Sequence, residues 1–463
     1  MVIRVLLIFK QMKVTIVLAL CLALMSGVSA QKSKSLFNGK NLKGWKTLVG
    51  EAEFKVEDGV IVGTSKSGTP STWLATKNDY TNFILEYEFV LGEGLNSGVQ
   101  FRSQYNEEKK HFFGPQVEAD DSERAWTAGI YDQGRKGWRY PLEYNPAAKK
   151  ALKRGEWNKV KVIAYENRIV TWMNGVNVAN LIEESVETGF IALQVHAAGK
   201  NKDGVQNKWR NISITELDEE PSFADTTAPV VSYLKNQLTE EQKKDGWKLL
   251  WDGKTAEGWR GAKKDNFPEN GWTMEDGILM VHASGGGESA HGGDIVTTRP
   301  YKNFILEVDF KFAKGANSGI KYFVDTDLNK GKGSAIGCEF QILDDKNHPD
   351  AKKGVGSKRT IGSLYDLIKA DSRLFVHGLK PLKYVNNGQW NRARIEVTGS
   401  KVKHVLNGCT VVEYERGTQQ WKALVAYSKY AKWPNFGEAE EGLILLQDHG
   451  DDVEFKNIKI KEL

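Results

Sequence analysis

Short segments in which apolar and polar residues alternate make up most of the chain. Residues 83–89 and 304–310 each place an apolar side chain at every second position. A period of two with one apolar face is typical of a half-buried β-strand. Helical periodicity is almost absent, so the pattern predicts an all-β protein.

Two other patterns refine this prediction. Residues 189–194 and 442–447 are nearly unbroken apolar runs, as expected of strands that are covered on both faces. The pair Asn174-Gly175, placed between two strand-like segments, indicates a tight hairpin turn. Many short strands separated by such turns predict a sandwich of two sheets.

The chain contains the same ordered set of motifs twice, roughly 220 residues apart, a spacing that fits two whole domains and not a solenoid repeat. The matching motifs include Asn96-Ser97-Gly98 with Asn317-Ser318-Gly319, Trp157-Asn158 with Trp390-Asn391, and Asn174-Gly175 with Asn407-Gly408. We therefore expect one domain over residues 35–217 and another over residues 246–463. Residues 218–245 have the composition of a linker, and a capping box from Thr239 to Gln242 predicts a short helix there.

The first 30 residues have the features of a secretory signal peptide. Lys10 and Lys13 precede an apolar run over residues 14–25, and small residues end at Ala30. The sequence predicts cleavage near Ala30 and a periplasmic or secreted protein. Lipidation at Cys21 is less favoured, because Leu20 is too large for the usual small residue before a lipidated cysteine.

Composition limits the classes of partner and metal site. With 463 residues and 40% hydrophobic content the chain is globular, and no later apolar run is long enough to span a membrane. Signal removal takes away three of the positive charges and no negative one, leaving a formal charge of +2 in place of +5. This balance gives no electrostatic case for nucleic acid. Cys338 and Cys409 permit one disulfide at most and no cysteine-rich metal site.

Each domain carries an acid and an amide two positions apart, in Gln116-Val117-Glu118 and in Glu339-Phe340-Gln341. Residues two apart on a strand share one face, so each pair projects into the same space. A carboxylate beside an amide suits sugar hydroxyls, and a desolvated carboxylate can act as a general base or acid. The alternative is a polar pair on a solvated strand face.

A second polar pair ends each of the apolar runs and favours a site over a solvated face. These pairs are Gln194 with His196 and Gln447 with His449. Among the aromatic residues, Trp126 and Trp138 lie in Gly- and Arg-rich sequence and are candidate platforms for sugar rings, while most other tryptophans are assigned to the core.

Two further motifs are interpreted as loops. The Gly-rich segment 284–294 lacks the flanking strand, helix and Lys-Ser/Thr of a phosphate-binding loop, and is assigned as a flexible loop. The acid pairs Asp120-Asp121 and Asp344-Asp345 lack the ligand spacing of a calcium loop and are interpreted as turn residues.

Taken in order, the motifs of both copies resemble the 3-keto-disaccharide hydrolase family, also described by 3-keto-glucoside lyase and 3-keto-glucal hydratase activity. The resemblance covers nearly the whole mature chain apart from the linker. It rests on the duplicated motifs above together with Leu36-Phe37-Asn38-Gly39, Leu364-Tyr365-Asp366 and Gln447-Asp448-His449-Gly450. It implies two concanavalin-like jelly-roll domains in tandem, export, and action on glycosides oxidised at C3.

The resemblance also implies roles for individual residues. Proton transfer is assigned to Glu339 and His449 in domain two, with Glu118 and His196 as the candidates in domain one. The residues expected to hold the sugar are Asn317, Lys321, Gln341, Tyr365, Gln447, Asn96, Arg102, Gln116, Tyr131 and Gln194. No cofactor is assigned, a divalent metal is left open, and so is the oligomeric state.

The two copies depart from the family pattern in different ways. Domain one reverses the order of acid and amide, and it has Ala197 where a glycine follows the histidine. Domain two keeps both motifs but has Lys321 near a position where arginine is usual. We therefore expect the more competent site in domain two, with domain one binding sugar or catalysing a complementary half-reaction. The chief rival is a non-catalytic carbohydrate-binding protein, since fold does not fix function, and a structural envelope protein is a third hypothesis.

Overall fold

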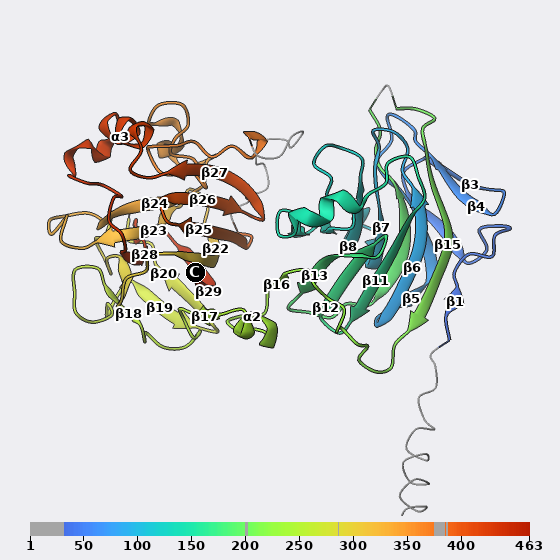
Figure 1. Ribbon diagram of the computed structural model, residues 1–463, viewed down its shortest axis with the longest axis horizontal. Helices are drawn as coiled ribbons and strands as arrows, with labels where there is room; N and C mark the ends of the chain where they lie inside the picture. The colour runs from blue at the N-terminus through green and yellow to red at the C-terminus, as the bar shows by residue number, and fades with distance from the viewer. Residues whose placement is uncertain (1–31, 200–201, 286, 375–384, 386–387) are drawn as a thin grey trace, which may run out of the picture.

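Figure 1 shows the computed structural model, in which two β-sandwich lobes lie side by side and are joined by the segment that contains strand β16 and helix α2. The structure describes residues 32–463 except 200–201, 286, 375–384 and 386–387. The predicted signal peptide therefore lies outside the described residues. No helix of the described part is long and apolar enough to cross a membrane.

Each domain is built from two antiparallel sheets packed face to face. In domain one the first sheet has the order β16 (Val230–Ser232), β13 (Val176–Ile182), β12 (Arg168–Met173), β11 (Asn158–Tyr165), β6 (Phe83–Val90), β15 (Gln206–Glu216), β4 (Val60–Thr64) and β3 (Glu53–Glu57), with β1 (Lys34–Ser35) beside β15. The second sheet has the order β10 (Gly137–Tyr140), β9 (Ile130–Gln133), β8 (His111–Asp120), β7 (Asn96–Asn106), β14 (Gly189–Val195), β5 (Thr72–Tyr80) and β2 (Trp45–Val49). Among the strands that the structure describes, the short β16 alone pairs in parallel, with β13.

Domain two repeats this arrangement with fewer strands in its second sheet. The first sheet has the order β19 (Trp272–Glu275), β20 (Ile278–Val281), β29 (Val453–Glu462), β22 (Phe304–Phe312), β25 (Asn391–Thr398), β26 (Lys401–Leu406) and β27 (Cys409–Glu415), with β17 (Trp247–Leu249) beside β29. The second sheet has the order β18 (Trp259–Gly261), β21 (Ile295–Thr297), β28 (Leu443–Leu446), β23 (Asn317–Asp325) and β24 (Ile336–Leu343). The fold is thus all-β, with two jelly-roll sandwiches in tandem.

Helices are short and lie between strands. They are α2 (Glu240–Lys244), α3 (Gln419–Ala426) and the 3₁₀ turns η1 (Pro146–Ala151), η2 (Pro349–Lys352), η3 (Ser372–Leu374) and η4 (Lys429–Lys432). The capping box expected at Thr239 is confirmed, because its side chain accepts from the Gln242 N–H while the Gln242 side chain accepts from the Thr239 N–H.

The alternating segments form the cores as their patterns predict. Strand β6 buries every second residue, and Phe83 meets Phe101 of the opposite sheet edge to face at 6.3 Å. In domain two Phe310 meets Phe340 in the same way at 6.5 Å. Such contacts between the two inner faces make one apolar core in each domain. The Asn174-Gly175 hairpin also forms, with positive φ at both residues.

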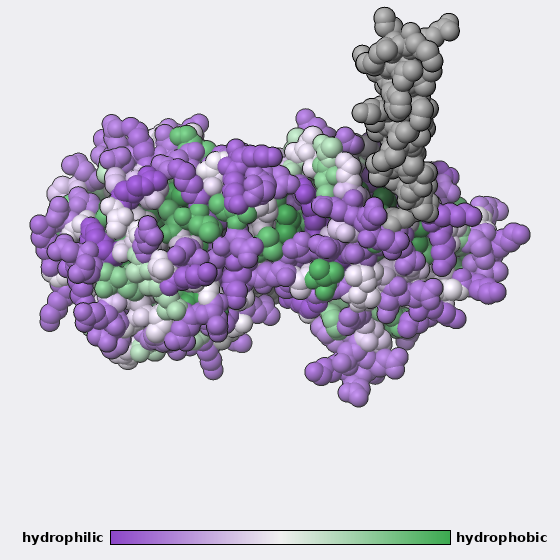
Figure 2. Space-filling view, turned by 90° about the horizontal axis from the view of Figure 1, so that it is seen from below, coloured by the Kyte–Doolittle hydropathy of each residue, from purple (hydrophilic) through white to green (hydrophobic). Residues whose placement is uncertain are grey.

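The two lobes contact each other through the linker and through facing loops. The Tyr233 ring, which follows β16, lies between the guanidinium groups of Arg139 and Arg392, at 3.3 and 4.0 Å from the ring centre. Lys456 of domain two pairs with Glu184 of domain one at 2.6 Å. In the face shown in Figure 2 the surface is mostly hydrophilic, with hydrophobic residues gathered near the middle of the molecule and over domain two.

Candidate active site

A row of polar side chains lies on the outer face of the second sheet of domain two. On β24, Phe340 points into the core, so Glu339 and Gln341 on either side of it point to the opposite face. The register pairs Lys321 of β23 with Glu339, and Gly319 with Gln341. Loops cover this face, which leaves Glu339 only 4% exposed.

Glu339 is a buried carboxylate whose position depends on a glycine. A Cβ atom on Gly319 would come within 2.5 Å of Glu339 Oε1, so the carboxylate lies directly over the bare backbone of β23. Burial raises the pKa of Glu339, and the nearby Lys321 ammonium opposes this rise. The Lys321 Nζ atom lies 3.7 Å from Glu339 Oε2. The carboxyl group is thus suited to exchanging a proton nearer to neutral pH than an exposed glutamate.

Lys321 is itself held in place from its far side. Its ammonium donates to the Ser334 hydroxyl and to the Ala335 carbonyl oxygen at 3.2 Å. Ser334 in turn donates to the buried carboxylate of Asp294. These contacts fix the cation beside Glu339, so its main effect is electrostatic.

Gln447 and His449 reach the same face from the end of β28. The Gln447 N–H donates to the Gly319 carbonyl oxygen at 3.0 Å, which places this residue next to β23 on the side away from β24. His449 is close enough to Glu339 to lower the pKa of that carboxyl group. The structure therefore places His449 in the neighbourhood of Glu339.

One side-chain atom of Gln447 and one of His449 have no hydrogen-bond partner among the described residues. They are Gln447 Oε1 and His449 Nδ1, and both are buried. Buried polar atoms are nearly always paired in native proteins, so an orphaned acceptor and an orphaned ring nitrogen beside a buried carboxylate indicate a place for a ligand or water.

The turn that carries His449 is held by buried hydrogen bonds. Asp448 Oδ2 accepts from the N–H groups of Gly292 and Gly293 at 3.2 and 2.9 Å, and the Asp448 N–H donates to Asp294 at 3.0 Å. The described part of the Gly-rich segment 284–294 is thus a support for the site, and Gly450 follows with a φ of 84°.

The other predicted sugar-binding residues of domain two lie around Glu339. The Gln341 amide donates to Asn317 Oδ1 at 3.1 Å. The Tyr365 N–H donates to the Glu339 carbonyl oxygen at 3.1 Å, and its hydroxyl donates to Asp350 at 2.7 Å. Gln341, Asn317 and Tyr365 therefore lie in the neighbourhood of Glu339.

Two residues that the sequence analysis did not select also face this site. Glu288 accepts from the Gln447 amide at 3.2 Å, and the Lys429 ammonium lies 4.0 Å from the centre of the Tyr365 ring. Burial lowers the pKa of Lys429, and Glu339 opposes this change. Glu288, Lys429 and Lys321 line one cavity of about 190 Å³. Glu288 comes from a loop and Lys429 from the 3₁₀ turn η4, and neither segment has strand periodicity, which is why no sequence pattern revealed them.

Domain one carries the same row with acid and amide exchanged. Its register pairs Gln100 with Gln116 and Gly98 with Glu118. Gln116 therefore stands where domain two has Glu339, and Glu118 stands where domain two has Gln341. Gln100 replaces Lys321.

Glu118 is closely engaged with neighbouring donor groups. It accepts from the amides of Asn96 and of Gln116, the latter at 2.9 Å, and Arg124 lies 3.3 Å away. Burial nevertheless raises its pKa to about 7, with Arg124 as the main opposing group. Most of its acceptor capacity is thus used by protein donors.

The remaining candidates of domain one are only partly assembled. Gln194 lies at the end of β14 with Oε1 buried and without a partner in the described structure. His196 is exposed, and its Nδ1 lies 2.9 Å from the carbonyl oxygen of Ala197. Tyr131 pairs with Gln116 across β9 and β8, the position that Tyr365 occupies beside Glu339 in domain two.

The structure does not bring Arg102 to this face. Its guanidinium donates to the carbonyl oxygens of Thr81 and Glu166 and to the Asn82 side chain at 3.1 Å. By strand register Arg102 corresponds to Phe323 of domain two, and not to Lys321. Its donors are used to join loops, so a role in holding sugar is not supported.

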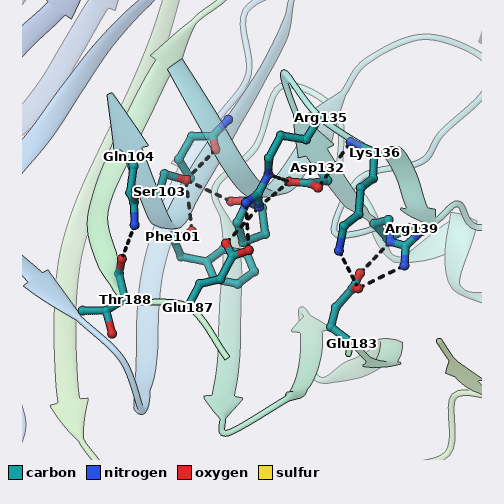
Figure 3. Close-up of polar contacts among 12 residues, drawn as sticks. Phe101, Ser103, Gln104, Asp132, Arg135, Lys136, Arg139, Glu183, Glu187 and Thr188 are labelled. Atoms are coloured by element: carbon teal, nitrogen blue, oxygen red, sulfur yellow. Dashed lines mark hydrogen bonds and ion pairs between the residues drawn. The ribbon is translucent and has the colours of Figure 1, made fainter. Parts of the chain in front are cut away.

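The hairpin that carries Tyr131 is fixed by a cluster of ion pairs, shown in Figure 3. Arg135 lies between Asp132 and Glu187, with contacts of 2.8 Å to each, while Lys136 and Arg139 both reach Glu183. Opposite charges are matched throughout this cluster. It joins the β9–β10 hairpin to residues 183–188 and acts as a structural support.

The structure corrects the prediction for Trp126 and shows the contacts of the predicted turn acids. Trp126 is fully buried and packs edge to face against Trp138 at 4.6 Å, so the prediction of Trp126 as a platform was wrong. Asp120 and Asp344 accept hydrogen bonds from neighbouring turn residues, as expected of turn acids. Within the described residues no group of three or more His, Cys, Asp or Glu side chains could hold a metal ion.

Comparison with known proteins identifies the family. The model of the 3-keto-alpha-glucoside-1,2-lyase-like domain matches this chain twice, at residues 32–215 and 246–461. The chain belongs to this family. A 3-keto-disaccharide hydrolase of Bacteroides thetaiotaomicron is 42% identical over 239 residues, which is 47% of this chain and 79% of the relative.

Solved structures of relatives are also available. A provisionally assigned glycosyl hydrolase from Parabacteroides distasonis is 30% identical, with a TM-score of 0.41, and covers 50% of this chain and 99% of its own. A second such protein from the same organism is 28% identical, with a TM-score of 0.32, and covers 47% of this chain and 99% of its own. Both are shorter than this chain, which is matched by the family model in two regions.

Proposed function

We propose that this protein is an exported enzyme that cleaves 3-keto-glycosides, and that domain two carries the main active site. The observation that carries the proposal is the buried Glu339 carboxylate, with its raised pKa, in a neighbourhood where Gln447 and His449 each bury a polar atom that has no partner among the described residues. Family membership and the hydrolase relative support action on carbohydrate.

The chemistry of a 3-keto sugar explains why one base is sufficient to begin the reaction. The ketone acidifies the proton on C2, so Glu339 removes it and the C2–H electrons form an enolate on the C3 oxygen. When the enolate collapses, a double bond forms between C1 and C2, and the C1–O bond breaks with its electrons leaving on oxygen. An acid protonates that oxygen, and addition of water to the double bond then gives the free 3-keto sugar.

The residues around Glu339 match these demands. Lys321 and Lys429 supply positive charge for the developing enolate, and preorganised charge of this kind is often the largest contribution to catalysis. We assign the second proton transfer, to the leaving oxygen, to His449. Gln341, Asn317 and Tyr365 surround the acid and would orient the ring.

The test compares a 3-keto-disaccharide with its unoxidised parent. We expect the wild-type protein to release free sugar from the keto form only, because the parent has no acidic C2 proton. Glu339→Gln removes the base and should slow release by about 10²–10⁴-fold, the usual contribution of a general base. Glu118→Gln is the matched control in domain one and should retain most activity.

The rival hypothesis of a non-catalytic carbohydrate-binding protein makes a different prediction. Such a protein would retain either sugar without turnover. Comparable cleavage of the unoxidised disaccharide would instead contradict elimination and favour a conventional glycosidase, which requires two opposed carboxyl groups.

A further inference from the structure

A groove on domain two extends away from Glu339. The cavity of about 190 Å³ beside Lys321 adjoins a second cavity of about 290 Å³, because Lys332 and Gly333 line both of them. The second cavity runs along residues 261–264 and 289–294. We call these two adjacent cavities together the basic groove.

Positive charge dominates the lining of this groove. Besides Lys321, its lysines are Lys263, Lys264, Lys332, Lys429 and Lys432. The carboxylates that line it are Glu288 and Asp294, and Asp294 is buried and accepts from Ser289, Ser334 and the Asp448 N–H. Glu288 is therefore left as the accessible negative charge.

These five lysines have no carboxylate partner. Among the described residues, none of their ammonium groups lies within ion-pair distance of an acid, whereas Lys321 lies beside Glu339. The Lys263 ammonium contacts only the carbonyl oxygens of Gly331 and Gly333, which leaves its charge uncompensated.

A cavity lined by residues of both domains provides a contrast. It is of similar size, about 470 Å³, and is also lined by cations. There, however, Arg392 pairs with Asp309 at 2.6 Å, and Lys456 pairs with Glu184 at 2.6 Å. Its charges are already matched within the protein, so it has no comparable demand for an anion.

An aromatic ring lies beside the unmatched lysines. Trp433 is half-buried and lines the first cavity, with the Lys432 ammonium 5.2 Å from its ring centre. An indole beside cations offers a stacking surface for a sugar ring next to groups that attract an anion. Neither duplex nucleic acid nor a lipid surface would be expected to enter two connected cavities of this size.

We propose that the basic groove binds an acidic saccharide, so that domain two acts on 3-keto-glycosides attached to sugars that bear carboxylate or sulfate groups. This inference rests on the proposed function for the reaction, and the groove extends it with a prediction about the charge of the substrate. Lys321 and Lys429 would meet the reacting ring, while Lys264, Lys332 and Lys432, which line the same two cavities, would meet the anionic groups. Lysine ammonium groups bind such anions as point charges and do not require one fixed geometry.

The test uses the triple variant Lys264→Gln, Lys332→Gln and Lys432→Gln in the full chain. Its binding is measured by calorimetry with three size-matched oligosaccharides, one of uronic acids, one sulfated and one neutral. We expect the acidic ligands to bind the variant at least tenfold more weakly than wild type, and the neutral ligand to bind both equally. Raising the salt concentration should weaken binding of the acidic ligands to wild type only.

A matched control variant changes three exposed lysines of domain one that also form no ion pair within the described structure, Lys40→Gln, Lys77→Gln and Lys109→Gln. It carries the same change in net charge and should bind like wild type. Equal weakening in this control, or equal affinity of wild type for neutral and acidic ligands, would overturn the proposal. Groove-dependent binding of duplex DNA or of anionic lipid vesicles more tightly than the acidic saccharides would overturn it as well.

The two proposals fail separately. The triple variant leaves Glu339, Lys321 and Lys429 in place, so it should cleave a neutral 3-keto-disaccharide like wild type. If wild type does not cleave that substrate, the proposed reaction is wrong and the binding result stands. If cleavage occurs but the acidic ligands show no preference, only the groove proposal is wrong.

Discussion

At the scale of single residues, Glu118 and Glu339 differ in the groups that surround their carboxylates. Glu118 is surrounded by amides and an arginine, whereas Glu339 lies near the ammonium groups of Lys321 and Lys429, which line a cavity. Positive charge beside a cavity suits a base that acts on a bound ligand. This contrast supports the proposed role of Glu339 as the base, with Glu118 as a binding or structural acid.

The raised pKa of Glu118 has a consequence for stability. Its pKa rises from an ordinary value of 4.5 to about 7 on folding, so the folded state holds this proton more tightly than the unfolded state. The raised pKa therefore contributes up to about 3 kcal/mol to the free energy of unfolding. This contribution is fully present below pH 4.5 and is lost as the pH rises towards 7. We expect Glu118→Gln to flatten the pH dependence of the free energy of unfolding between pH 4.5 and 7, measured by urea titration. An unchanged slope in this variant would contradict the assignment.

The raised pKa of Glu339 predicts a pH dependence of catalysis. A general base acts when deprotonated, so kcat/KM for cleavage of the keto sugar should rise with pH, with a midpoint above the ordinary carboxyl value of 4.5. The rise should be absent from the residual activity of Glu339→Gln. Measurement of kcat/KM from pH 4 to 8 for both proteins checks this, and a rise that persists in the variant would assign it to another group.

At the scale of elements, the strand β23 shapes the site through a missing side chain. Gly319 leaves room for the Glu339 carboxylate to lie across the strand. We expect Gly319→Ala to push that carboxylate aside and to lower kcat by on the order of a hundredfold, since a displacement of about 1 Å can have such an effect. The single-turnover rate on the keto sugar measures it.

A matched variant in domain one separates this effect from general damage to a strand. A Cβ atom on Gly98 would come within 2.4 Å of Gln116, the residue that stands in the place of Glu339. Gly98→Ala should disturb domain one in a similar way and leave cleavage largely intact. Equal losses in both variants would show that strand distortion, and not the position of Glu339, causes the effect.

Much at this scale was predictable from sequence, because strands and tight turns are local. Alternation predicted β6 and β22, and Asn174-Gly175 predicted its hairpin. The pairing of Glu339 with His449 followed from polar residues placed on predicted strands. Glu288 and Lys429 could not be found this way, because their positions depend on how loops fold over a sheet. Trp126 was misassigned for the same reason, since a Gly- and Arg-rich loop gave no sign that Trp138 would cover it.

At the scale of the whole molecule, the Tyr233 ring joins the two domains. It lies between Arg139 of one domain and Arg392 of the other, and a desolvated cation–π contact contributes about 2 kcal/mol. We expect Tyr233→Ala to weaken the contact between the domains and to increase the rate of proteolysis within residues 218–245. Tyr427→Ala is a suitable control, because Tyr427 is 93% exposed. Equal cleavage rates in the two variants would show that Tyr233 does not hold the domains together.

The exchanged order of acid and amide also means that equivalent strands present the carboxylate at different positions. On β8 the acid is Glu118, and on β24 it is Glu339, which corresponds to Gln116. Moving from one to the other requires no change of backbone, because Gly98 and Gly319 leave the same open space beneath residues 116 and 339. Transplanting three side chains, by Gln100→Lys, Gln116→Glu and Glu118→Gln, would give domain one the row that domain two uses. The two matched regions of the chain thus provide two equivalent scaffolds, of which one can change its specificity while the other keeps its row of side chains.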